Sequence, residues 1–130
     1  MSDIQEIASK VKETLDAKGS IEKGVCSLSK KRDLQVTVQG RKFTGELEIG
    51  IHFESLESDG TALNYAEIVL LPDEVPSFTR ALGQNDLTIT AIHNHWLYAE
   101  PDIKYLHVQS VEKPEEFAQK LNKAFQVLKK

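Results

Sequence analysis

The sequence contains few of the features that mark a specialised class of protein. Its 130 residues include a single cysteine, Cys26, which excludes an internal disulfide and a cysteine-rich zinc site. No apolar run approaches the roughly 18–20 residues that span a bilayer. The N-terminal segment mixes charged and apolar residues and does not resemble a secretory signal. We therefore expect a cytoplasmic protein that does not enter a membrane.

The charge balance argues against a nucleic-acid partner. Asp and Glu number 20 against 16 Lys and Arg, so the net charge is -4. An acidic surface repels phosphate backbones. The hydrophobic fraction of 40% and the charged fraction of 28% are ordinary for a globular protein. The length matches one domain of usual size, so we expect residues 1–130 to form a single domain.

Hydrophobic periodicity divides the chain into helices and strands. Ile7, Val11 and Leu15 recur on one helical face, and Ser2 or Asp3 can cap that helix. The expected elements are a helix at 3–18, a Gly/Ser/Lys-rich connection at 19–31, strands at 34–39, 47–53 and 65–71, a helix between 73 and 83, strands at 87–95 and 103–111, and a helix from 114 to 128. The order α-β-β-β-α-β-β-α predicts an α+β domain, with helices packed against a mixed, largely antiparallel sheet. The central β-α-β unit should join parallel strands.

Three of the four histidines lie within fifteen residues of one another, in AIHNHWLYAEPDIKYLH. His93 and His95 share a face of their strand, because side chains alternate along a strand. If the following hairpin turns near residues 99–100, His107 lies opposite position 91 or position 93. Cross-strand neighbours are about 4.5–5.5 Å apart at Cβ and diagonal neighbours about 7–8 Å apart. Imidazoles at those separations can converge on one ion.

This arrangement predicts a divalent metal site. Three histidines, or two with a carboxylate, are the usual ligands of a catalytic zinc ion, although imidazole also suits other transition metals. Glu100, in the intervening loop, is a candidate fourth ligand or general base. Glu67 interrupts an apolar strand and is a candidate to orient a metal-binding histidine without binding the metal itself. Trp96 and Tyr98 could line a pocket beside the histidines.

Several blocks of the chain resemble the LppY/LpqO-like family of uncharacterised bacterial domains. The most specific block is TAIHNHWLYAEPDIKYLH, from Thr90 to His107, and the others are AEIVLLPDEV and KRDLQVTVQG. The resemblance covers about residues 20–128. Asp102 stands where the family usually has arginine. The resemblance implies that six residues belong together and names no substrate; they are Glu67, Glu74, His93, His95, Glu100 and His107.

Three functional hypotheses follow. The first is a small metal-binding domain that acts as a hydrolase, with Glu100 taking a proton. The second is a binding module without metal, whose histidines and aromatic residues line a pocket for a small molecule or a peptide. The third is a homodimer formed by a sheet edge, for which residues 34–38 are the candidate strand.

Overall fold

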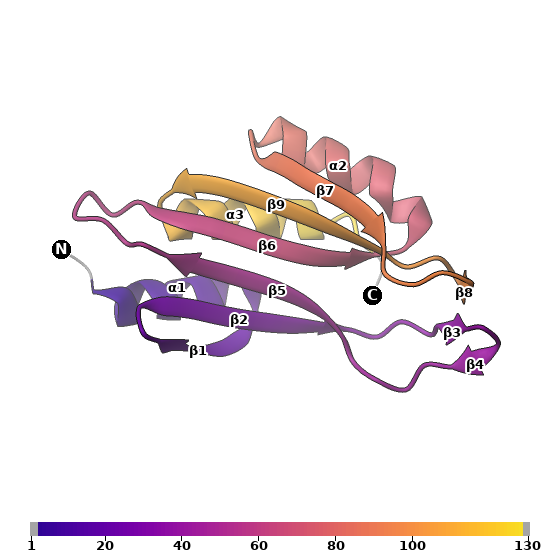
Figure 1. Ribbon diagram of the computed structural model, residues 1–130. Coiled ribbons are helices and arrows are strands. Elements are labelled where there is room, and N and C mark those ends of the chain that lie inside the picture. Colours follow the sequence, from indigo (N-terminus) through magenta and orange to yellow (C-terminus); the bar gives the residue numbers. More distant parts are fainter. Residues whose placement is uncertain (1–2, 129–130) are drawn as a thin grey trace.

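The computed structural model describes residues 3–128, and within them three α-helices cover one face of a six-stranded sheet, with a three-stranded sheet at one end (Figure 1). The elements are α1 (Ile4–Leu15), β1 (Lys18–Glu22), β2 (Val25–Arg32), β3 (Thr37–Val38), β4 (Arg41–Lys42), β5 (Leu47–Glu54), β6 (Ala62–Leu70), the 3-10 turn η1 (Pro72–Glu74), α2 (Val75–Gln84), β7 (Thr88–Asn94), β8 (Ala99–Glu100), β9 (Lys104–Glu112) and α3 (Pro114–Phe125). The α+β class and the general order of helices and strands expected from the sequence are confirmed.

The strand order explains how the middle of the chain is connected. The large sheet has the order β1-β2-β5-β6-β9-β7, and each neighbouring pair is antiparallel. Both β6 and β7 are antiparallel to β9, so they run in the same direction. The β6-α2-β7 unit therefore joins parallel strands as predicted, but β9 is inserted between them.

The core lies between the sheet and the helices. In β5 the buried residues Leu47, Ile49, Ile51 and Phe53 alternate with partly exposed ones, as expected for a strand with one buried face. Leu15, Phe78, Leu121 and other helical residues close the core from the other side. The opposite side of the six-stranded sheet, which none of the helices within residues 3–128 covers (Figure 1), is called the open face below.

The nearly continuous apolar run at 65–71 predicts a strand buried on both faces, and this holds only for its second half. Ile68, Val69 and Leu70 are fully buried, whereas Tyr65 and Glu67 are half-buried on the open face. Val69 shares a face of the strand with Tyr65 and Glu67, and it lies near the end of β6 that is closest to the small sheet (Figure 1).

Two sequence-based assignments were wrong. The expected connection at 19–31 is the β1-β2 hairpin, whose two turn residues, Lys23 and Gly24, both have positive φ angles as such hairpins require. The expected strand at 34–39 contributes only β3, which pairs with β4 on one side and β8 on the other. Because β3 is the central strand of its sheet, residues 34–38 are not a free edge.

The helix ends also follow local rules. The Asp3 side chain accepts a hydrogen bond from the Glu6 N–H and caps α1, while Ser2 lies outside the described residues. Pro114 opens α3 as predicted, and Phe117, Leu121 and Phe125 face inward. None of the helices within residues 3–128 combines the length and the apolar character needed to cross a membrane.

Candidate functional site

The histidines gather on the open face where β7 and β9 pair. His107 has Glu67 of β6 and Ala91 of β7 as its two cross-strand partners. His93 lies opposite Tyr105, one diagonal step from His107. The register with His107 opposite position 91, one of the two considered from the sequence, is therefore present.

A β-bulge sets which way β7 faces. Ile89 pairs with Val108 and Ala91 pairs with His107, so Thr90 is an extra residue in the ladder. Such a bulge reverses the alternation of the residues that follow it. Ile89 consequently faces the helices and His93 faces the open side, whereas regular alternation along the predicted strand at 87–95 would place them on the same face.

His93 and His107 are in direct contact. Their Nε2 atoms are 2.9 Å apart, and the ring centroids are 5.1 Å apart. The Nδ1 of His93 lies 3.0 Å from the carbonyl oxygen of Asn94. A carbonyl only accepts, so this Nδ1 carries the proton and donates. In the neutral ring, the Nε2 of His93 then holds a lone pair directed at His107.

His95 lies beside this pair without joining it. Its ring stacks on Tyr105 at 4.4 Å and meets the edge of Trp96 at 4.0 Å. Burial, and secondarily the charge of His93, lower the pKa of His95, while Glu67 opposes the shift. The ring is therefore neutral at pH 7, the form that binds metals. Within residues 3–128, no group of three His, Cys, Asp or Glu side chains is arranged to hold a metal ion.

Glu67 lies in the middle of the open face. Its cross-strand partners are His107 on one side and Gly50 on the other. Burial, and then the charges of Glu67 and Glu48, raise the pKa of Tyr105. A Cβ atom added at Gly50 would lie 3.4 Å from Oε1 of Glu67 and 3.3 Å from Nε2 of His52. The missing side chain at Gly50 thus leaves a depression that both groups border.

A second polar cluster lies next to this depression, and sequence reasoning largely missed it. The Nδ1 of His52 is 3.2 Å from the Ser27 hydroxyl, and the His52 ring stacks on Tyr65 at 5.0 Å. The Tyr65 hydroxyl donates to Glu54 at 2.5 Å. This hydrogen bond, and then burial, raise the pKa of Tyr65 to about 12, so the phenol is protonated at neutral pH. Alternation along residues 47–53 predicts that His52 lies on the polar face of its strand. Only the strand register brings it to Ser27 and Tyr65.

The remaining predicted residues lie elsewhere. Glu100 is exposed on β8, opposite Thr37 in the small sheet. Trp96 packs against Phe43 and His95, whereas Tyr98 is 77% exposed. Glu74 is buried and forms a two-point ion pair with Arg32. The structure therefore brings His93, His107 and Glu67 together, with His95 beside them.

Hollows in the surface flank Glu67. One, of about 430 Å³, is lined by His52, Tyr65, Glu67 and His107, among others. Another, of about 410 Å³, is lined by Gly50, His52, Glu67 and Tyr105, among others. The first hollow borders the histidine pair at His107. The second borders Glu67 and Tyr105, which are cross-strand partners of His107 and His93.

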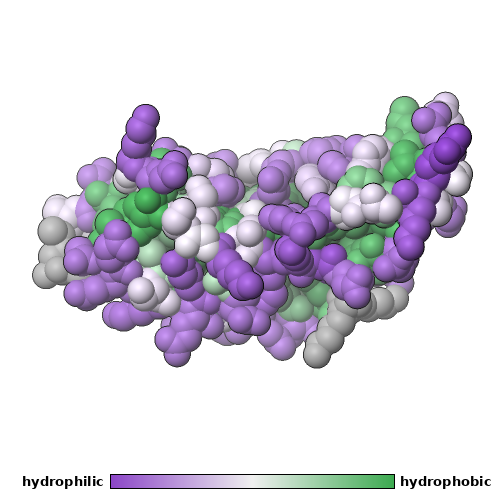
Figure 2. Space-filling model, turned by 90° about the horizontal axis from the view of Figure 1, so that it is seen from below, coloured by the Kyte–Doolittle hydropathy of each residue, from purple (hydrophilic) through white to green (hydrophobic). Residues whose placement is uncertain are grey.

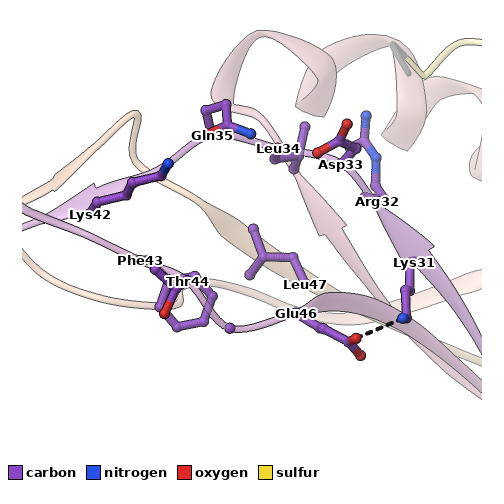
Figure 3. A pocket seen from close by; sticks show the side chains of 11 residues that line it. Lys31, Arg32, Asp33, Leu34, Gln35, Lys42, Phe43, Thr44, Glu46 and Leu47 are labelled. Carbon is purple, nitrogen blue, oxygen red and sulfur yellow. Dashed lines mark ion pairs between the residues drawn. The ribbon is translucent and has the colours of Figure 1, made fainter.

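A third hollow has no histidine in its lining. It has a volume of about 500 Å³ and lies between the end of β2 and the segment that leads into β5 (Figure 3). Lys42 and Gln35 line one end of it, and an ion pair of 2.6 Å joins Lys31 to Glu46 at the other. None of the residues singled out in the sequence as candidates for the site lines it.

A family model described as "Domain of Unknown Function (DUF1259)" matches residues 9–127. The chain belongs to this family. No curated protein and no solved structure matches the chain. The match to this domain of unknown function includes all of β2 to β9, so the histidine pair, Glu67 and His52 lie within the family domain. The LppY/LpqO-like resemblance stays a prediction from the sequence.

Proposed function

We propose that this domain binds a divalent transition metal ion, such as zinc, through Nε2 of His93 and Nε2 of His107. The 2.9 Å approach of these two nitrogens on the open face supports the proposal. Two nitrogens bound about 2.0–2.1 Å from one ion are about 3.3 Å apart at a tetrahedral angle and about 2.9 Å apart at a right angle. The separation of the two nitrogens would therefore need to change by no more than a few tenths of an ångström.

The tautomer of His93 fits this role. Its Nδ1 donates to the backbone carbonyl of Asn94, which leaves Nε2 as the ligating atom. Histidines that bind metals commonly donate the other ring nitrogen to a carbonyl or a carboxylate, which orients the ring. Glu67, the cross-strand partner of His107, supplies negative charge close to the pair. His95 would have to leave its stack on Tyr105 to become a further ligand.

Metal analysis of protein purified without a histidine tag tests this proposal. After dialysis against zinc and removal of free metal, the wild-type protein should hold at least about half an equivalent per chain, because both ligands are preformed. His93→Ala and His107→Ala should each lose the bound zinc. His52→Ala removes a histidine from the same face and should retain it. A wild-type content below about a tenth of an equivalent would rule out the proposal.

The alternative is a metal-free binding module, and the same contact gives it support. A nitrogen separation of 2.9 Å is also the normal length of an N–H···N hydrogen bond. In this version His107 donates to His93, and the hollows beside Glu67 bind a small polar molecule or a peptide. Nitrogen NMR can report the tautomers of the two rings. Fixed, neutral and complementary tautomers that do not change when zinc is added would favour the metal-free module over metal binding. Hydrolysis stays a prediction from the sequence, since its expected base, Glu100, lies on the small sheet.

A further inference from the structure

Ser27 and His52 form a contact on the open face in which the proposed metal site takes no part. The two residues are cross-strand partners on β2 and β5. Ser27 is exposed, and its hydroxyl oxygen lies 3.2 Å from Nδ1 of His52. A serine within hydrogen-bond reach of an imidazole becomes a nucleophile when the imidazole takes its proton. The contact therefore joins a candidate nucleophile to a candidate base.

Two neighbours fix the orientation and the tautomer of the His52 ring. The ring stacks on Tyr65, its cross-strand partner on β6, with the centroids 5.0 Å apart and the planes 16° apart. Nε2 of His52 and Oε1 of Glu67 border the same depression, 3.3 and 3.4 Å from the position of a Cβ atom added at Gly50. A carboxylate on that side favours the tautomer with the proton on Nε2. Nδ1 then keeps its lone pair and accepts from the Ser27 hydroxyl.

Gly50 leaves room for a substrate beside this pair. It lies inside β5, where the register with both neighbouring strands is regular, and its φ angle is not positive. Neither a bulge nor a turn therefore requires a glycine at this position. A glycine inside a strand often marks a place where a ligand approaches the backbone closely. The hollow of about 410 Å³ that Gly50 borders is also lined by Ser27, His52 and Glu67, so the nucleophile, the base and the carboxylate share one space.

The rest of this hollow indicates the kind of substrate. Ser29, Glu48 and Tyr105 line it, and Lys18 and Gly19 extend the lining to β1. Figure 2 views the molecule from the side that carries β1 and shows a mainly hydrophilic surface. A hollow of this size with polar walls suits a small polar ester better than a lipid. The ammonium group of Lys18 supplies positive charge at its border, where negative charge develops on the carbonyl oxygen of a reacting ester.

We propose that Ser27 is the nucleophile of an acyl-transfer site that hydrolyses small polar esters. Oγ of Ser27 attacks the carbonyl carbon of the ester while Nδ1 of His52 takes the hydroxyl proton. The bond between that carbon and the alkoxy oxygen then breaks, and His52 gives the proton to the leaving alcohol. Water attacks the acyl-serine, again giving a proton to His52, and releases the carboxylic acid while the proton returns to Ser27. This reaction uses none of the proposed metal ligands, so the inference is independent of the proposed metal binding.

The test uses the full, untagged chain in EDTA, with p-nitrophenyl acetate as the ester. We expect a burst of p-nitrophenol and, by mass spectrometry of the quenched reaction, an acetyl group on Ser27. A fluorophosphonate should label the same oxygen with loss of fluoride. Ser27→Ala should lose the burst and both adducts. His52→Gln should slow acylation about 10²–10⁴-fold, the usual contribution of a general base.

Ser20→Ala is the matched control, since Ser20 is exposed on β1 directly opposite Ser27; it should react like the wild type. Tyr65→Leu should slow acylation and Tyr65→Phe should restore it, because the aromatic ring holds His52 in place. Nitrogen NMR should find the proton of neutral His52 on Nε2.

Three results would each overturn the inference. They are a wild-type protein without an adduct on Ser27, an acylation rate that His52→Gln leaves unchanged, and a His52 tautomer with its proton on Nδ1, which could not take the serine proton. Ser27→Ala and His52→Gln should hold as much zinc as the wild type. Loss of zinc binding in the wild type and loss of acylation are therefore separate outcomes, and each one overturns only its own proposal.

Discussion

Replacing Glu74 by glutamine should destabilise the domain strongly, because it removes the negative charge that forms a two-point ion pair with the buried Arg32. The side chains of Arg32 and Glu74 are only 5% and 2% exposed. Their two contacts measure 2.7 and 2.9 Å, and Arg32 also donates to the Val69 carbonyl at 3.0 Å. Glutamine keeps the size of the side chain and an oxygen that can accept from the Leu71 N–H. The substitution therefore removes mainly the charge.

The expected loss is about 3–5 kcal/mol, the usual cost of removing one member of a buried pair. Arginine cannot lose its proton to escape this cost. The loss is a large share of a total stability of about 5–15 kcal/mol. Urea unfolding followed by circular dichroism measures it, and a slope of about 1–3 kcal/mol per molar predicts a midpoint at least about 1 M lower.

Two comparisons make the measurement decisive. Glu46→Gln breaks an ion pair of similar length, but Lys31 and Glu46 are largely exposed, so the midpoint should stay within error. Arg32→Met combined with Glu74→Gln removes the buried charge and should recover most of the loss. A decrease for Glu74→Gln no larger than that for Glu46→Gln would refute the reasoning. Unchanged zinc content in folded Glu74→Gln would show that Glu74 acts on stability and not on the metal.

Two further predictions concern the β1-β2 hairpin. Cys26 is fully buried, and burial raises the pKa of its thiol despite the opposing charge of Lys12. At pH 8 a thiol reagent should therefore modify Cys26 only at the rate at which the domain unfolds. An immediate stoichiometric reaction would contradict this prediction. Gly19→Ala should cost about 1–3 kcal/mol, because the new Cβ would lie 2.0 Å from the Ser27 carbonyl oxygen. Gly83→Ala in α2 meets nothing within 4 Å and should instead stabilise the domain by up to about 1 kcal/mol, as urea unfolding of both variants would show.

The helices were predictable because each carries a complete local signal. Asp3 caps α1, Pro114 opens α3, and apolar residues recur at helical spacing in both. The β1-β2 hairpin was missed for a physical reason. Its open-face residues include Ser27 and Ser29, and small polar residues at that density have the composition of a loop. Cys26 and Leu28 alternate with these serines and are buried. They indicate a strand, but two apolar residues make only a short alternation.

The candidate site was predictable only as far as strand pairing could be guessed. The hairpin between β7 and β9 is local, so its loop length limited the register to two choices, one of which places Ala91 opposite His107. Glu67 approaches His107 because β6 pairs with β9, and His52 approaches Tyr65 because β5 pairs with β6. The register of neither pair follows from the register of β7 with β9. A one-residue slip in either pair would turn the side chains to the other face, and the sequence contains no local signal that fixes it.

The bulge at Thr90 offers a direct test of how backbone register positions the histidine pair. Deleting Thr90 leaves Ile89 opposite Val108 and Ala91 opposite His107 in a regular ladder, so His93 should still face the open side and zinc should still bind. Inserting one threonine after Thr90 adds a second unpaired residue. If the bulge accommodates only one unpaired residue, the insertion shifts the register by one and turns His93 toward the helices. Zinc content and urea unfolding of both variants separate the effects. Loss of zinc from a stably folded deletion variant, or its retention in the insertion variant, would show that strand register does not decide metal binding.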